Sequence, residues 1–264
     1  MASVNSVVNF EGFYGPATAT LDWCEANYQF SFYVAELVNT FSNLYSIALG
    51  RALPPVYTIG FIGFAFVGLG SFAFHATLLF HWQLADELPM VYVASIGCWV
   101  LYDRSPGFSF NSPRALITLL MTVALDALFT WSYIINRNPV YHQVVFGTIA
   151  SAIGVRIAYL LNWSEESSRL PDDKKAEIGS VFGTGAGLFI FGFFIWNLDN
   201  IFCEPLTAWK TAVGWPLAFL FEGHAWWHIF TGTGTYFMVG DHRNYTMQYP
   251  YGFPIVKYAY HKAP

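Results

Sequence analysis

Long apolar stretches separated by short polar segments run through most of this 264-residue chain. A helix needs about 20 mostly apolar residues to cross a bilayer, and seven stretches meet or approach that length. The pattern predicts an all-α membrane protein, a bundle of seven transmembrane helices built as one domain over residues 1–264. The predicted helices are Phe32–Gly50, Tyr57–Phe80, Gln83–Tyr102, Ala115–Ile135, Pro139–Leu161, Ile178–Leu198 and Trp215–Val239.

The composition strengthens the membrane assignment. Only 11% of the residues are charged and 20% are aromatic, whereas soluble domains carry about 25% charged residues. The net charge of −5 is scattered along the chain without a basic run, so we expect no nucleic-acid partner. No feature indicates an obligate protein partner. The residues before Phe32 contain neither lysine, arginine nor an apolar core, so we expect no signal peptide.

The distribution of lysine and arginine predicts the orientation. Two of these residues fall on one side of the predicted bundle, one lies inside a helix, and nine fall on the other side. By the positive-inside rule, the tail at 241–264 is cytoplasmic and the N-terminal segment at 1–31 faces the lumen or the cell exterior. The nine are Arg51, Arg104, Arg114, Arg169, Lys174, Lys175, Arg243, Lys257 and Lys262.

Five polar side chains inside the apolar stretches stand out. Ser71 and His75 are four residues apart, so they share one face of the second helix. Asp86 follows after a short turn, at the head of the third helix. His224 and His228 repeat the four-residue spacing in the seventh helix. The predicted topology places all five in the outer half of the membrane, where ionisable groups are costly and usually functional.

These residues suit a catalytic zinc site. Catalytic zinc takes three protein ligands and a water, whose pKa it lowers to about 7. His75, His224 and His228 are the predicted ligands; Asp86 would hold and deprotonate the water, and Ser71 would donate to the developing oxyanion. Two alternatives are histidines that merely bond to neighbouring helices, and a seven-helix receptor with a structural zinc. A structural site is normally closed by four protein ligands, so the Ser and Asp favour catalysis.

A second polar group precedes the first predicted helix. Its oxygen donors fit a hard cation such as calcium. The alternative is that Asn27 or Ser31 caps the first helix and Glu36 bonds inside the bundle, and spacing alone favours this capping. The calcium candidates are Asp22, Trp23 (through its backbone carbonyl), Glu25, Asn27 and Glu36.

Short motifs extend this pattern over most of the chain, from Leu21 to Gly232. They are Leu21-Asp-Trp-Cys-Glu-x-Asn27, Ala35-Glu36-x-x-Asn39-Thr-x-Ser-Asn43, Gly70-Ser71-x-x-Phe-His75-x-Thr-Leu, Gln83-Leu-x-Asp86-Glu-Leu-Pro-Met90, Phe194-x-Trp196-Asn-x-Asp199-Asn-Ile-Phe-Cys203-Glu204 and His224-Ala-Trp-Trp-His228-Ile-x-Thr-Gly232. In these motifs the chain resembles the alkaline ceramidases, seven-helix intramembrane amidases within a wider group of membrane hydrolases that includes the adiponectin receptors. The tail at 241–264 matches no motif of that family.

The resemblance implies a function and assigns the site residues. It implies zinc-dependent hydrolysis, within the membrane, of the amide bond of ceramide (N-acylsphingosine, dihydroceramide or phytoceramide), yielding a sphingoid base and a fatty acid. The zinc ligands of the family match the three histidines, and its matching serine and aspartate, Ser71 and Asp86, complete the site. The five calcium candidates match a calcium site of the family. The resemblance therefore favours calcium over the capping of the first helix. It also implies a Cys24–Cys203 disulfide and a location in the endoplasmic reticulum or Golgi membrane. A hydrolase of another lipid amide or ester on the same scaffold remains the alternative.

Overall fold

The computed structural model describes residues 12–50, 58–102, 112–168 and 171–240. Within these ranges the chain is almost entirely helical, and its one β-bridge joins Gly12 to Gly15. In chain order the helices are α1 Leu37–Gly50, α2 Thr58–Thr77, α3 Phe80–Tyr102, α4 Pro113–Asn136, α5 Pro139–Asn162, α6 Glu165–Ser168, α7 Asp172–Ile201, α8 Cys203–Val213, the 3₁₀ helix η2 Leu217–Phe221, and α9 Gly223–Gly240.

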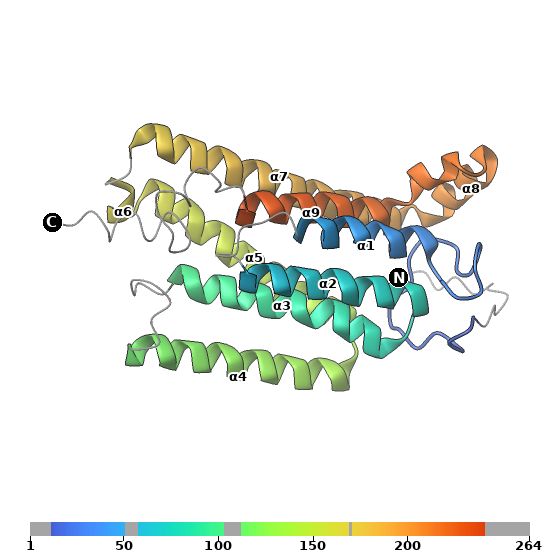
Figure 1. Cartoon of the computed structure of the whole chain (residues 1–264), viewed down its shortest axis with the longest axis horizontal. Helices are drawn as coiled ribbons and strands as arrows, with labels where there is room; N and C mark the ends of the chain where they lie inside the picture. Colours follow the sequence, from blue (N-terminus) through green and yellow to red (C-terminus); the bar gives the residue numbers. More distant parts are fainter. Residues whose placement is uncertain (1–11, 51–57, 103–111, 169–170, 241–264) are drawn as a thin grey trace.

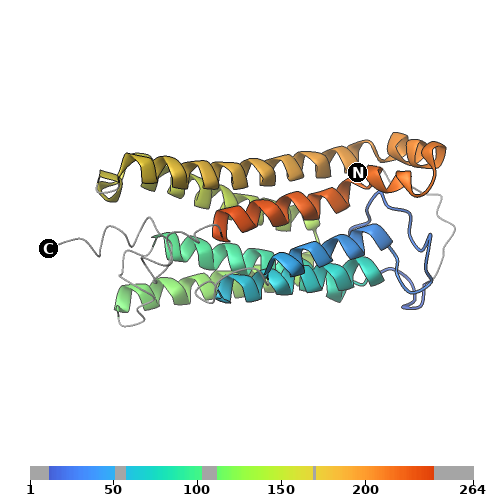
Figure 2. The same cartoon turned by 45° about the horizontal axis from the view of Figure 1, so that its top comes forward.

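The long helices run side by side (Figure 1), and the contacts between successive neighbours close them into a ring. Helix α9 lies between α7 and α1, as Figure 2 shows, and α1 packs on α2, which packs on α3. Helix α3 also packs on α5, and a buried cluster of Leu101, Ile157, Leu160 and Ile178 joins α3, α5 and α7 near one end. Helix α4 packs against α3 on the outside of this ring. The ring therefore places α1, α2 and α9 beside one another although they are distant in sequence.

Among the described residues, four helices are long and apolar enough to cross a membrane, namely α3, α4, α5 and α7. Their outward faces carry large exposed apolar side chains, such as Leu125 on α4 and Ile190 on α7, which suits a lipid solvent better than water. The prediction of an all-helical membrane protein is thus confirmed. The count of seven spans and the orientation of the termini stay predictions.

Three helix starts differ from the predicted ones by five residues or more. The first helix begins at Leu37 rather than Phe32, because the buried Glu25 carboxylate accepts the backbone N–H groups of Val38 and Asn39, at 2.6 and 2.8 Å, and fixes the helix start there. The sixth predicted helix is α7, which begins six residues earlier, at Asp172, within the charged stretch where acidic residues favour a helix N-terminus.

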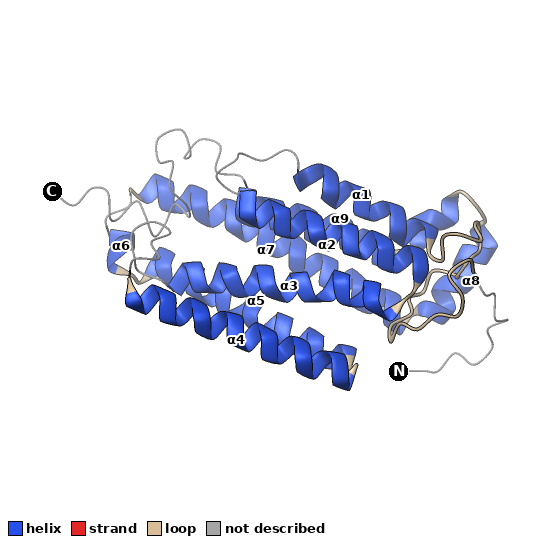
Figure 3. Cartoon of the chain, turned by 60° about the horizontal axis from the view of Figure 1, so that its bottom comes forward, coloured by secondary structure: helices blue, strands red, loops and turns tan. Residues whose placement is uncertain are grey.

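The last predicted helix is divided. Residues from Trp215 to Glu222 form a turn and the short η2, and the α-helix begins only at Gly223. Gly214 adopts a positive φ of 72°, outside the right-handed helical region, so the chain turns at this point before η2 begins. The sequence pattern also missed α8, which is too short and too polar to read as a span. Figure 3 shows that α8 and the long loop before α1 lie at the same end of the bundle.

Candidate metal centre

The α2–α3 hairpin brings the first site residues together. Helix α2 ends at Thr77, and Leu78 in the left-handed conformation, with φ 52°, reverses the chain so that α3 starts at Phe80. Gly70 permits close packing of the two helices, because a Cβ built there would lie 2.1 Å from the carbonyl oxygen of Ala85. The Ser71 hydroxyl donates a hydrogen bond to the carboxylate of Asp86 on α3.

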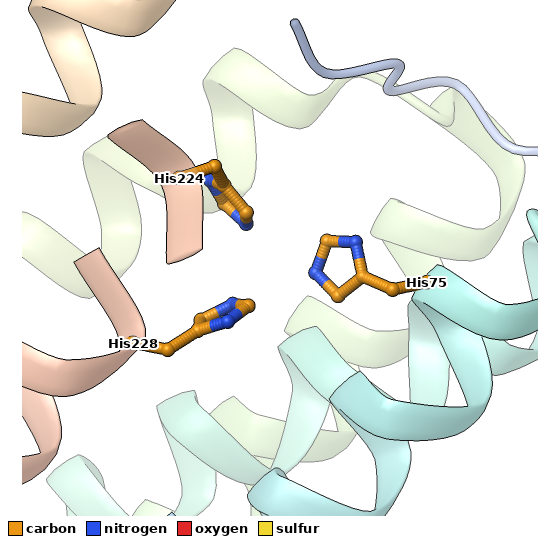
Figure 4. A group of neighbouring side chains, drawn as sticks. All are labelled: His75, His224 and His228. Carbon is orange, nitrogen blue, oxygen red and sulfur yellow. The ribbon is translucent and has the colours of Figure 1, made fainter. Parts of the chain in front are cut away.

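Three histidines from two helices converge at this end of the bundle. His75 lies in the last turn of α2, and His224 and His228 lie in the first two turns of α9. One nitrogen of each ring lies within 4.8 Å of the corresponding atoms of the other two, and all three residues are buried. Figure 4 shows the three rings directed toward a common point. In the ranges that the structure describes, this is the one group of His, Cys, Asp and Glu side chains so arranged.

The contacts of the ring nitrogens fit a metal ion. His75 Nδ1 bonds Oε2 of Glu36 at 2.5 Å, while its Nε2 is buried without a partner among the described residues. His228 Nδ1 bonds the hydroxyl of Ser42 at 2.7 Å, which leaves its Nε2 for a ligand. An unpaired buried nitrogen is costly. A metal ion held by neutral imidazoles would satisfy it, and three protein ligands with an open position are the arrangement of a catalytic zinc site.

The N-terminal segment covers the triad from one side. The indole of Trp23 stacks on the His224 ring with a centroid separation of 3.8 Å and an interplanar angle of 15°. The backbone N–H groups of Ala35 and Glu36 donate to the carbonyls of Ala76 and His75, at 2.9 and 3.0 Å. The segment before α1 therefore lies across the end of α2 and shields the histidines from water.

The calcium candidates lie in this same segment. Glu36 is fully buried; its Oε1 accepts a hydrogen bond from the backbone N–H of Trp23 at 3.3 Å, and its Oε2 bonds His75. Asp22 is exposed and accepts a hydrogen bond from the Asn27 amide at 3.0 Å. The Asn27 side-chain oxygen is buried and, among the described residues, unpaired. Carboxylates near an unpaired amide oxygen fit a hard cation, but they are less closely grouped than the histidines.

The alternative to calcium is wrong about the cap of the first helix, but its other part, that Glu36 bonds inside the bundle, is confirmed by the contact with His75. Glu25, rather than Asn27 or Ser31, caps α1, and the Ser31 hydroxyl accepts the N–H of Tyr33 instead, at 3.0 Å. Burial raises the pKa of Glu25 to about 8, although the two backbone N–H groups oppose this shift. A protonated Glu25 would lose an acceptor for the helix start, so a nearby cation would favour the charged, capping form.

A disulfide and a buried ion pair hold the remaining elements around the triad. Cys24 and Cys203, the pair that the resemblance implies, form a disulfide that joins the N-terminal segment to α8. Lys210 on α8 donates to the Glu222 carboxylate and to the Cys24 carbonyl, each at 2.9 Å. Since Glu222 lies two residues before His224, these contacts fix the start of α9.

Sequence reasoning missed the residues that support the histidines. The Glu36–His75 pair, the Ser42 hydroxyl on His228, and Asp199, whose carboxylate accepts the N–H of Gly223 at 3.0 Å, all act across helices. The available signal was the presence of polar residues within apolar helices. Their partners depend on which helices are neighbours, which periodicity does not reveal.

Comparison with known proteins identifies the family. A protein-family model described as Ceramidase matches residues 15–249. The chain belongs to the ceramidase family. It is 33% identical over 243 residues to alkaline ceramidase 3 of Mus musculus, covering 87% of this chain and 84% of that protein.

Two further relatives agree with this assignment. Alkaline ceramidase YPC1 of Saccharomyces cerevisiae is 33% identical over 254 residues, or 86% of this chain and 77% of its own length. An alkaline ceramidase of Drosophila melanogaster is 30% identical over 236 residues, or 84% and 75%. The resemblance of the motifs to the ceramidase family is thereby confirmed, and the matched region contains the histidine triad, Ser71 and Asp86.

Proposed function

We propose that this protein is a zinc-dependent ceramidase, which hydrolyses the amide bond of ceramide within the membrane to a sphingoid base and a free fatty acid. The observation that carries the proposal is the buried convergence of His75, His224 and His228 beside the hydrogen-bonded pair of Ser71 and Asp86. Membership of the ceramidase family and relatives named as alkaline ceramidases support the substrate class.

The residues have separable roles. The three histidines would hold zinc, which would supply Lewis acidity toward the amide carbonyl and toward water. The Asp86 carboxylate takes a proton from the attacking water and delivers it to the leaving nitrogen. The Ser71 hydroxyl donates a hydrogen bond to the oxyanion that forms from the amide carbonyl. Glu36 and Ser42 hold two of the imidazoles through Nδ1, which fixes ring orientation.

The setting fits a lipid substrate. Ceramide is apolar apart from its head, and the long helices present apolar faces outward, so we propose that substrate reaches the site from the bilayer. We further propose a seven-span arrangement in the endoplasmic reticulum or Golgi membrane, with the triad in the outer half and the tail at 241–264 in the cytoplasm. The chain functions as one domain without an obligate protein partner.

We also propose a calcium site formed by Asp22, the Trp23 carbonyl, Glu25, Asn27 and Glu36. It is supported by the buried unpaired oxygen of Asn27 and by the neighbouring carboxylates. Because Glu36 also bonds His75 and Trp23 stacks on His224, calcium there would stabilise the cover over the triad. Its role is structural and regulatory.

The function is tested by measuring zinc content and ceramide hydrolysis on the same purified preparations. The variants are Asp86→Asn, which keeps size and removes the base, and a control, Asp126→Asn, on α4 outside the ring. Asp126 accepts a hydrogen bond from Ser95 at 2.9 Å, so it controls for loss of a carboxylate within the apolar region. We expect zinc near one per chain in all three proteins, with hydrolysis lost only in Asp86→Asn.

The other outcomes separate parts of the proposal. A wild type without zinc overturns the mechanism, provided the protein is folded. Zinc without turnover of ceramide keeps the site and reassigns the substrate to another lipid amide or ester. Full hydrolysis by Asp86→Asn refutes the assignment of the base.

A further inference from the structure

The three histidines differ in the surroundings of their second nitrogen. Nδ1 of His75 bonds a carboxylate and Nδ1 of His228 bonds a hydroxyl. Nδ1 of His224 is buried, and no described residue is its hydrogen-bond partner. A histidine that binds a metal almost always donates its other ring N–H to an acceptor, which fixes its tautomer and orientation. One member of the triad therefore lacks the support that the other two receive.

An unpaired acceptor lies beside the start of α9. Asp199, near the end of α7, is 2% exposed, and its Oδ1 accepts the backbone N–H of Gly223, the residue before His224. Its Oδ2 is also buried and, as far as the structure describes the chain, unpaired. The contact is close, because a Cβ built on Gly223 would lie 2.8 Å from the Cβ of Asp199. A desolvated acceptor and a desolvated ring nitrogen thus occupy the same junction of α7 and α9.

We propose that Asp199 is the positioning residue for His224. Its Oδ1 holds the first turn of α9 through Gly223, and its Oδ2 accepts a hydrogen bond from Nδ1–H of His224 when the triad is loaded with zinc. This inference rests on the zinc site proposed above. It goes further by assigning the third support of the triad to α7, a helix that contributes no ligand.

The orientation of the rings agrees with this assignment. Figure 4 shows the outer end of the His224 ring, which carries Nε2, directed at His75 and His228. Trp23 stacks on one face of that ring and restricts its tilt, but stacking does not determine which ring edge faces the metal. A hydrogen bond from Nδ1 to a carboxylate does determine it. The Cys24 backbone N–H also faces the Asp199 carboxylate, so the same residue joins the N-terminal segment to α7 and α9.

The experiment compares Asp199→Asn with Asp199→Ala. Asparagine retains the oxygen that accepts the Gly223 N–H but replaces the second oxygen with an NH₂ group, which cannot accept a proton from His224. Alanine removes both contacts. Asp126→Asn is the matched control, since it makes the same change in another apolar helix. The readout is the rate at which full-length, zinc-loaded protein loses zinc to a chelator, followed by mass spectrometry and independent of turnover.

We expect both Asp199 variants to retain zinc about 10- to 100-fold less well than wild type, and the control to match wild type. If Asp199→Asn retains zinc like wild type, Asp199 has no role toward His224, whether or not Asp199→Ala is impaired, and the inference is overturned. A wild type that binds no zinc overturns the proposed function and this inference with it. A zinc-loaded wild type with an unaffected Asp199→Asn overturns the inference alone.

A second measurement needs no variant and therefore does not depend on the variants folding. Nitrogen-15 NMR of the histidine side chains in zinc-loaded wild type reports which nitrogen carries the proton. We expect His224 to carry a protonated Nδ1 and a metal-bound Nε2. Zinc bound through Nδ1, or an Nδ1 without a proton, contradicts the assignment.

Discussion

Gly70 is the position at which one added methyl group tests the geometry of the site most directly. The side chain of Gly70→Ala would lie 2.1 Å from the carbonyl oxygen of Ala85 and 2.8 Å from the backbone nitrogen of Asp86. Both obstacles are helix backbone, whereas ordinary contacts begin at 3.4 Å. Helix α3 must therefore move away from α2 by about 1 Å, an overpacking that costs about 1–3 kcal/mol of stability.

This displacement acts on the chemistry because Asp86 moves with α3 while Ser71 and His75 stay on α2. A misplacement of about 1 Å in an active site can lower the rate about 100-fold, equivalent to about 2.7 kcal/mol in the activation barrier. The zinc ligands lie on α2 and α9, so zinc content should be unchanged. We therefore expect kcat for ceramide to fall about 100-fold in protein that still holds zinc.

The assay measures released sphingoid base by mass spectrometry, with zinc content and thermal unfolding on the same samples. Gly147→Ala on α5 is the control, since nothing lies within 4 Å of a Cβ there and alanine favours a helix over glycine. Gly70→Ala with kcat within about threefold of wild type would refute the argument that the α2–α3 contact sets the position of Asp86.

Three further predictions concern the cover and the start of α9. Replacing both Cys24 and Cys203 with serine opens a link across 179 residues, so thermal unfolding should show a loss of about 2–4 kcal/mol; an unchanged melting temperature would contradict this. Lys210→Met leaves the Glu222 carboxylate buried without its cation and should cost about 3–5 kcal/mol in stability. Adding Glu222→Gln should restore much of this loss. No recovery in the double variant would refute the pairing. Removing calcium with a selective chelator should lower both the rate of ceramide hydrolysis and the melting temperature. Glu36→Gln should make both quantities independent of calcium. A variant whose hydrolysis and melting temperature still fall on chelation would exclude Glu36 from the calcium site.

Much of the candidate site could be predicted because it depends on local spacing. Ser71 with His75, and His224 with His228, are four residues apart in apolar stretches, and helical periodicity alone places each pair on one face. Asp86 could be assigned to the same region because only a short turn separates its helix from that of His75. The membrane character followed from the scarcity of charge.

Other features depended on contacts between distant segments. The start of α1 was misplaced by five residues because it is set by Glu25, 12 residues before Leu37. The division at Trp215–Glu222 and the existence of α8 were missed because hydropathy does not register turn geometry or a short helix. The partner of Glu36 inside the bundle could not be named, since its bond to His75 requires the N-terminal segment to lie across the end of α2.

The sequence by itself therefore determined which side chains are available for chemistry, their grouping in pairs along helices, and the family. Only the tertiary structure decided which partner supports each histidine: Glu36 for His75, Ser42 for His228 and, by our proposal, Asp199 for His224. The physical reason is that helical periodicity specifies a face but not the neighbour that the face meets. That neighbour follows from the packing of α1, α7 and α9 on one another, which close contacts at glycines permit. No local pattern in the chain encodes this packing.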